Sequence, residues 1–247
     1  MVAKKPLLSE AENETKRAPF RDEDKIKILL WCERHCCLCG KPCDTNIEIH
    51  HIEQEGSKRK LSNIDNAIPL CYDCHGRINS YNPKHAVGTA YKIREIKTRR
   101  DQIFDKYTQH LVPIVTFDIF QGTPDKPELS TFPKTITFVA HRSSSLPVKA
   151  RVEVKHVLGG EDLGVMRDEK GYYSGETDWH LNPAVTINGN FTVLKECQDS
   201  KDDLKIEVRL TIIDLYERPH RMLPQAWTFV REKRYWYLEP RSFTKWR

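Results

Sequence analysis

Two pairs of cysteines with identical spacing constrain the fold of this chain most. The pairs are Cys36-x-x-Cys39 and Cys71-x-x-Cys74, and seven of the eight cysteines lie between Cys32 and Cys74. A CxxC pair on a tight turn directs two thiolates at one ion, so two pairs can close a tetrahedral zinc site. The sequence therefore predicts a structural zinc centre that joins two segments distant along the chain.

The choice of ligands has one ambiguity, because Cys37 and Cys43 offer other spacings beside the first pair. We prefer Cys36 and Cys39, since they fit the CxxC turn and are followed by Gly40, which suits left-handed backbone. Four free buried thiols are the alternative to a metal site. Two further cysteines are expected in the apolar core instead: Cys32 and Cys197.

The first 20 residues lack the apolar segment of a signal peptide, and no run of about 18 apolar residues suggests a membrane span. We therefore expect a cytoplasmic protein with no membrane partner, in which residues 1–20 form a flexible lead. Disulfides are disfavoured in that compartment, which favours metal binding by the cysteines. The net charge of +5 is compatible with a polyanionic partner without requiring one.

The sequence pattern changes near residue 112. Before it, apolar residues at helical intervals predict helices over 21–35 and 87–111, and Pro113 marks the end of the second. After it, alternating or β-prone stretches predict strands at 134–142, 149–157, 204–216 and 226–238. Asn188-Gly189 lies between two β-prone runs and predicts a tight hairpin. Residues 113–247 are thus expected to form an antiparallel β-sandwich-like domain.

A pair of adjacent histidines lies between the two cysteine pairs. His50 and His51 occur within a strand-like run, where neighbours point to opposite faces, so only one can face an apolar core. Asn66 stands five residues before Cys71, and His75 directly follows the last cysteine. The predicted zinc site would therefore hold the two ends of a segment rich in metal-binding and proton-transferring groups.

Together, "IEIHHI", Asn66 and "CYDCH" resemble the HNH endonuclease family in its four-cysteine, zinc-supported form, over about residues 20–85. The resemblance implies a ββα-metal fold, in which a hairpin and a helix present the active site. The expected fold class is α+β, with an HNH nuclease domain at 21–112 that ends in a long helix. The β-sandwich-like domain at 113–247 would follow it in a regulatory or target-binding role.

The resemblance also implies a role for each polar residue of the segment. His51 would be the general base, His50 and His75 would bind a catalytic Mg²⁺ or another divalent metal, and Asn66 would fix the loop and orient the base. Phosphodiester hydrolysis needs an activated water and a cation at the leaving oxygen. Opposite-facing neighbours would let His50 face the metal while His51 faces the water.

Basic residues near the expected site suggest contacts with DNA, and the expected substrate is double-stranded. They are Lys58, Arg59 and Lys60, between the hairpin and Asn66, and Arg77 after the last cysteine. Contacts to phosphates set affinity without reading sequence. For the basic residues of the helix at 87–111, DNA contact and a solvated face remain open alternatives.

The sequence thus predicts a metal-dependent DNA endonuclease, in the context of a regulated microbial defence or mobile-element nuclease. A non-catalytic zinc-containing binding module and an RNA-directed nuclease are the alternatives. Double-strand cutting with one site per chain would favour a homodimer. The C-terminal half carries no catalytic motif that we recognise, and it could bind an activating ligand or protein. Its aromatic end is expected to supply core and edge-strand residues, and a stacking surface for single-stranded nucleic acid is the alternative.

Overall fold

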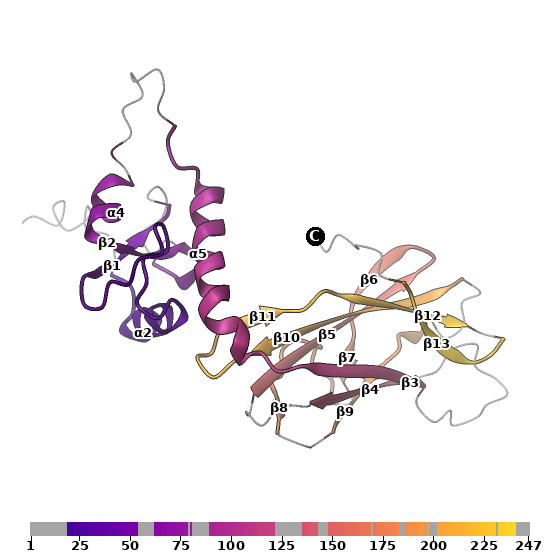
Figure 1. The fold of residues 1–247 in the computed structure, drawn as a ribbon. Helices are drawn as coiled ribbons and strands as arrows, with labels where there is room; N and C mark the ends of the chain where they lie inside the picture. The colour runs from indigo at the N-terminus through magenta and orange to yellow at the C-terminus, as the bar shows by residue number, and fades with distance from the viewer. Residues whose placement is uncertain are drawn as a thin grey trace, which may run out of the picture. The chain divides into compact units, whose positions relative to one another are not determined.

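A computed structural model describes eleven stretches of the chain: 19–53, 62–78, 80, 89–121, 135–142, 148–168, 170–182, 186–195, 197, 202–230 and 232–240. The chain divides into two compact units, Met1–Gln109 and His110–Arg247. Helices gather in the first unit and antiparallel strands dominate the second, so the predicted α+β class is confirmed (Figure 1). No helix among these residues is both long and apolar enough to cross a membrane. Residues 1–18 of the predicted lead lie outside the described stretches.

The first unit begins with helix α2 (Asp22–Trp31), which has three acidic residues in its first turn. Negative charge there favours the partly positive N-terminus of a helix. Ile28 and Trp31 are buried and attach the helix to the rest of the unit. The helix is shorter than the predicted 21–35, because Glu33 and Arg34 have φ angles of 43° and 53°. Such left-handed backbone cannot continue a right-handed helix.

A two-stranded hairpin and a short helix follow. Strand β1 (Ile47–His51) pairs antiparallel with β2 (Ala67–Cys71), and helix α4 (Tyr72–Arg77) begins at the next residue. Every residue of β2 is buried, which accounts for its continuous apolar sequence. The Sγ atom of Cys71 accepts a hydrogen bond from the Cys74 backbone N–H and so caps α4. The order of elements is therefore ββα.

Helix α5 (Ile93–Thr108) is the last helix of the first unit, and the 3₁₀ turn η2 (Gln109–Leu111) spans the boundary with the second. It begins later than the predicted residue 87. Its buried residues recur every fourth position and form one stripe: Ile96, Arg100, Phe104 and Thr108. The Arg100 guanidinium donates hydrogen bonds to the backbone carbonyls of Asp65 (2.6 Å) and Ala67 (3.3 Å). This helix therefore fixes the segment that enters β2.

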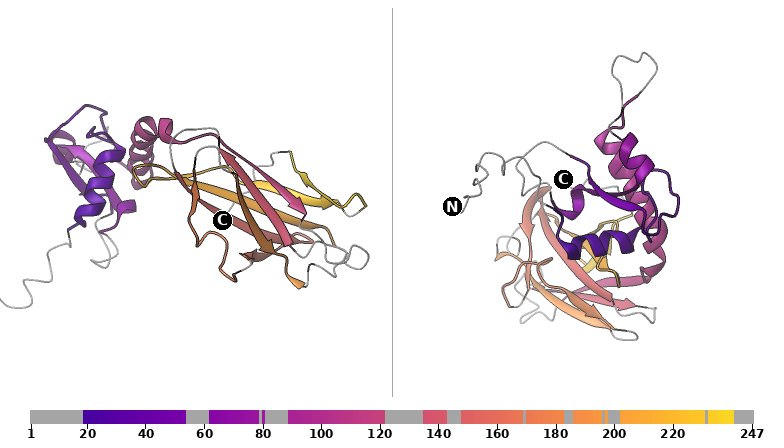
Figure 2. Two further views of the ribbon diagram at one scale, coloured as in Figure 1. Left: turned by 90° about the horizontal axis from the view of Figure 1, so that it is seen from below. Right: turned by 90° about the vertical axis from the view of Figure 1, so that its left-hand side faces the viewer.

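The second unit contains two antiparallel sheets, as Figures 1 and 2 show. The larger has the order β13-β12-β10-β5-β6 with β8 and β11 attached, and the smaller has the order β3-β4-β9-β7. The strands are β3 (Val115–Gln121), β4 (Thr135–Arg142), β5 (Val148–Leu158), β6 (Glu161–Val165), β7 (Arg167–Asp168), β8 (Trp179–Leu181), β9 (Ile187–Thr192), β10 (Leu204–Ile213), β11 (Pro219–Arg221), β12 (Gln225–Val230) and β13 (Tyr235–Leu238).

One apolar core joins these two sheets. Phe138 and Phe191 of the smaller sheet belong to the same buried cluster as Val154 and Val208 of the larger. Strand β10 alternates buried and half-buried residues along its length, as the predicted strand at 204–216 requires. Cys197 is buried in this cluster, and Cys32 is buried in the first unit, so neither is a surface thiol.

The hairpin predicted at Asn188-Gly189 is wrong, because strand β9 runs straight through both residues. Gly189 lies opposite Phe138 of β4. A Cβ atom at Gly189 would lie 2.1 Å from Cη2 of Trp179, so the missing side chain makes room for this indole ring. Glycine inside a strand often marks such a close approach. The Asn-Gly pair therefore forms no turn, and its glycine allows β9 to pack closely against Trp179.

The single strand predicted at 226–238 is also corrected. It is a pair of strands, β12 and β13, that are antiparallel neighbours in the larger sheet. Arg234, which immediately precedes β13, has a φ angle of 52°, a turn conformation that an extended strand does not use. The alternation of residue types is similar in one long strand and in two short ones, which explains the error.

Replacing Gly189 with alanine is expected to lower the free energy of unfolding of the second unit by about 1–3 kcal/mol, the usual cost of overpacking a core. The added methyl group must displace the Trp179 ring. Urea denaturation followed by circular dichroism measures the change. Gly76→Ala is the control, because no described residue has an atom within 4 Å of a Cβ atom there and alanine favours helix. Equal stability of wild type and the Gly189 variant would contradict the packing role.

Candidate active site

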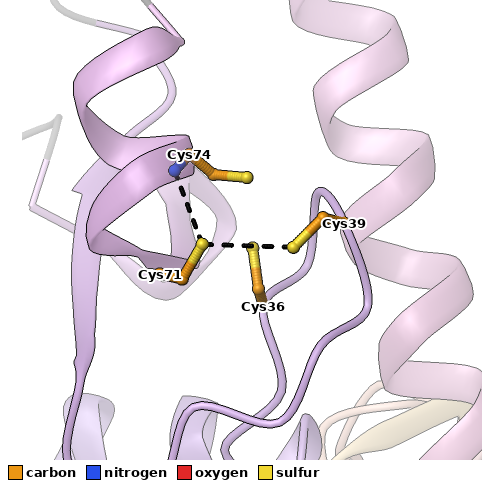
Figure 3. A group of neighbouring side chains, drawn as sticks. All are labelled: Cys36, Cys39, Cys71 and Cys74. Atoms are coloured by element: carbon orange, nitrogen blue, oxygen red, sulfur yellow. Dashed lines mark hydrogen bonds between the residues drawn. The ribbon is translucent and has the colours of Figure 1, made fainter.

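The four predicted cysteines come together at one point of the first unit (Figure 3). The Sγ atoms of Cys36, Cys39, Cys71 and Cys74 all lie within 4.8 Å of one another, and those of Cys39 and Cys71 are 4.0 Å apart. A tetrahedral zinc with Zn–S bonds of about 2.3 Å separates its sulfurs by about 3.8 Å. Both the donor set and the spacing therefore fit zinc.

The turn that carries the first pair is attached to both neighbouring elements. Gly40 has a φ angle of 75°, the left-handed backbone expected from the sequence, and its N–H donates to the Cys36 carbonyl. The Cys37 N–H donates to the Pro69 carbonyl in β2 at 2.9 Å. The Lys41 ammonium lies 2.7 Å from the Asp73 carboxylate in α4. The turn is thus held in place beside β2 and α4.

The cysteines rejected as ligands make other contacts. The Cys37 thiol points to the His35 carbonyl, and the Cys43 thiol donates to the Lys41 carbonyl at 3.3 Å. Neither belongs to the group of converging sulfurs. The preference for Cys36 and Cys39 from the CxxC spacing is therefore supported by the geometry.

The four converging thiols cannot easily ionise together without a cation. Burial opposes ionisation of Cys71, but hydrogen bonds from the Cys74 backbone and from neighbouring thiols lower its pKa to about 7. Burial raises the pKa of the Cys74 thiol, and its contact with Cys71 raises it further. Because thiolates so close together repel one another, a divalent cation is what such a set accommodates.

His50 and His75 meet where β1 contacts α4. The centroids of their rings are 4.8 Å apart, with an interplanar angle of 81°. His50 is buried, whereas His75 is partly exposed. Glu48 lies two residues before His50 and therefore on the same face of β1. Its Oε2 atom is 3.2 Å from Nδ1 of His75. The sequence reasoning missed Glu48, although its i−2 position on the strand was a usable signal.

His51 has different neighbours, as expected for the opposite face of β1. Its ring stacks on Phe20, with centroids 4.1 Å apart and an interplanar angle of 19°. Its Nε2 atom is 3.2 Å from the Ser62 hydroxyl. Sequence reasoning singled out neither Phe20 nor Ser62, because both are distant along the chain and belong to no motif. The two histidines thus have separate environments despite being adjacent.

Asn66 is buried and connects the end of β1 to the start of β2. Its Oδ1 accepts from the Glu53 N–H at 2.7 Å, and its Nδ2 donates to the Glu53 carbonyl at 3.0 Å. The Asn63 side chain in turn accepts from the Asn66 N–H at 3.0 Å. Lys97 of α5 lies 2.6 Å from the Glu53 carboxylate. The chain leaving His51 is therefore held from two sides.

Only one of the predicted DNA-contacting residues falls within the described stretches. Arg77 lies at the end of α4, exposed, and its Nε donates to the Asp73 carbonyl at 3.2 Å. Lys58, Arg59 and Lys60 lie outside the described residues. Contact of these four residues with DNA stays a prediction.

The model of the HNH endonuclease family matches residues 36–80. This segment is an HNH domain. The match spans both cysteine pairs, the adjacent histidines, Asn66 and His75, so the resemblance noted in the sequence is confirmed. A comparison with curated proteins gives no match. The HNH domain supports a nuclease-type function and a phosphodiester hydrolase class, while the second unit lies outside the matched segment.

Replacing Asn66 with aspartate is expected to lower the free energy of unfolding of the first unit by about 1–3 kcal/mol, the cost of unsatisfied buried polar groups. One carboxylate oxygen can still accept from the Glu53 N–H, but the other would face the Glu53 carbonyl. Native-state hydrogen exchange of first-unit peptides measures the loss. Asn63→Asp is the matched control, because Asn63 is exposed and its Oδ1 acts as an acceptor toward the Asn66 N–H, which aspartate also provides. Equal losses of stability in the Asn66 and Asn63 variants would contradict the role of the two hydrogen bonds between Asn66 and the Glu53 backbone.

Proposed function

We propose that this protein is a divalent-metal-dependent HNH endonuclease that hydrolyses DNA phosphodiester bonds. The observation that carries the proposal is the pairing of His50 and His75, 4.8 Å apart between their ring centroids, beside a His51 with separate neighbours. The HNH match over the same residues supports it. We further propose a cytoplasmic location and a regulated role in defence or in a mobile element.

His50 and His75 fit the role of metal ligands because two imidazoles from different elements meet there. The cation would be Mg²⁺ or another divalent ion, with remaining positions for water and substrate oxygens. When bound, it would neutralise negative charge that develops on the leaving 3′ oxygen. The four-cysteine zinc would hold β2 and α4 in place without taking part in the chemistry.

His51 would accept the proton of the attacking water. Unperturbed imidazoles titrate near pH 6.5, so a substantial fraction is neutral at cellular pH. The stacked Phe20 ring and the Ser62 hydroxyl would fix the plane and the rotation of the His51 ring. Asn66 would keep the chain after His51 in place through the Glu53 backbone. The products would carry a 5′ phosphate and a 3′ hydroxyl.

We propose that the substrate is double-stranded DNA, contacted through its phosphates by Arg77 and by Lys58, Arg59 and Lys60. The net charge of +5 is compatible with such a polyanionic partner. The second unit would bind the target or an activating ligand or protein. One site per chain would make a homodimer the natural form for double-strand cutting.

Incubation of the purified protein with supercoiled plasmid tests the proposal. Nicked or linear DNA is expected with Mg²⁺ or Mn²⁺ and none with a chelator, and end labelling should find 5′ phosphates. The His51→Ala protein is the matched control. Cleavage of RNA but not DNA in the parallel reaction would replace the proposed substrate. Identical, inactive behaviour of wild type and variant on both substrates would favour a non-catalytic binding module.

A further inference from the structure

Glu48 is an acidic residue on the same face of β1 as His50. Its Oε2 atom lies 3.2 Å from Nδ1 of His75, whose ring centroid is 4.8 Å from that of His50. None of the roles implied by the HNH resemblance involves this carboxylate. The contact joins the first strand of the domain to the helix that follows the second strand, at the histidine pair.

The nitrogen that makes this contact decides which atom of His75 remains for a metal. Histidines that bind a metal through one ring nitrogen usually donate the other N–H to a carboxylate, which fixes the tautomer and the ring orientation. A carboxylate at Nδ1 stabilises the proton there and leaves the Nε2 lone pair available. The contact at Nδ1 therefore leaves Nε2 as the nitrogen through which His75 would coordinate a metal.

We propose that Glu48 is a positioning residue, which holds His75 so that its Nε2 and His50 together bind a divalent cation. This inference rests on the proposed function, since it concerns the same metal site. Two other roles of Glu48 give different expectations. An ion pair between side chains that are 37% and 49% exposed would contribute little to stability and nothing to metal affinity. A direct carboxylate ligand would require the negative charge itself.

Glu48→Ala and Glu48→Gln separate these roles, because glutamine keeps an oxygen that accepts the Nδ1–H but loses the charge. Mn²⁺ binding to the full, zinc-loaded protein is measured by electron paramagnetic resonance, together with zinc content. We expect about 10–100-fold weaker Mn²⁺ binding in the alanine variant, as for other outer-shell carboxylates. The glutamine variant should stay within about threefold of wild type, since it retains the hydrogen bond.

Glu95→Ala is the matched control. Glu95 forms a comparable exposed ion pair, with Arg99 at 3.1 Å on α5, and should leave Mn²⁺ affinity unchanged. Unaltered Mn²⁺ binding in Glu48→Ala would overturn the proposal, and equal weakening in the alanine and glutamine variants would replace it with direct coordination. Failure of the proposed function gives a different result. In that case Mn²⁺ binding to the wild-type protein would not be reduced by His50→Ala.

Discussion

Replacing Cys71 with serine is expected to release the zinc and unfold the first unit. Cys71 ends β2, caps α4 and supplies one of the four converging sulfurs, so the change removes a ligand at the junction of two elements. Structural zinc contributes an apparent binding free energy of about 10–16 kcal/mol, comparable with the whole stability of a domain. Atomic absorption should find less than one zinc per chain, and limited proteolysis should degrade the first unit while the second remains.

The matched control for this prediction is Cys43→Ser. Cys43 is also buried in the same part of the first unit, but its thiol donates to the Lys41 carbonyl and lies outside the sulfur cluster. A serine hydroxyl can make the same hydrogen bond, so this variant should keep its zinc and its resistance to protease. A Cys71→Ser protein with a full equivalent of zinc would show that the metal site is misassigned.

Replacing His51 with alanine is expected to slow DNA cleavage by about 10²–10⁴-fold, the usual contribution of a general base. Zinc content and Mn²⁺ binding should be unchanged, because the His51 ring lies against Phe20 and Ser62, and neighbouring residues of a strand point to opposite faces, so His51 and His50 face away from each other. Single-turnover nicking rates at saturating Mg²⁺ measure the effect, with the fold checked by circular dichroism.

His50→Ala provides the comparison that separates a base from a ligand. Loss of a ligand weakens metal binding, so its cleavage defect should be partly relieved by higher metal concentration. The defect of His51→Ala should be the same at every saturating metal concentration. Wild-type rates in the His51 variant would place the base elsewhere in the chain.

The convergence of Cys36, Cys39, Cys71 and Cys74 could be predicted because CxxC is a local signal: the turn is set by a few neighbouring residues, including Gly40 with its φ angle of 75°. The separate environments of His50 and His51 followed from the alternation of a strand. The Glu48–His75 contact did not, because it depends on how α4 docks against β1. The catalytic role of His51 stays a prediction that the His51→Ala rates test, and the role of Asn66 in orienting the base also stays a prediction.

In the second unit, too, contacts between residues distant in sequence could not be predicted from local patterns. Alternation identified β5 and β10 as strands, but nothing in it indicated that Val154 would pair with Val208 across a long stretch of sequence. Asn188-Gly189 had the local chemistry of a turn, yet the Trp179 ring, which occupies the space beside Gly189, belongs to a different strand. Local propensity was overridden there by tertiary packing.

The contacts of α5 determine which fragment of the chain can contain the HNH segment as a folded unit. Arg100 holds the carbonyls of Asp65 and Ala67, and Lys97 pairs with Glu53, although α5 begins beyond residue 80, where the family match ends. An excised fragment that stops at residue 80 would leave those carbonyls and that carboxylate without their cationic partners. The smallest autonomous form of the first unit should therefore include all of α5, to the end of the unit at Gln109.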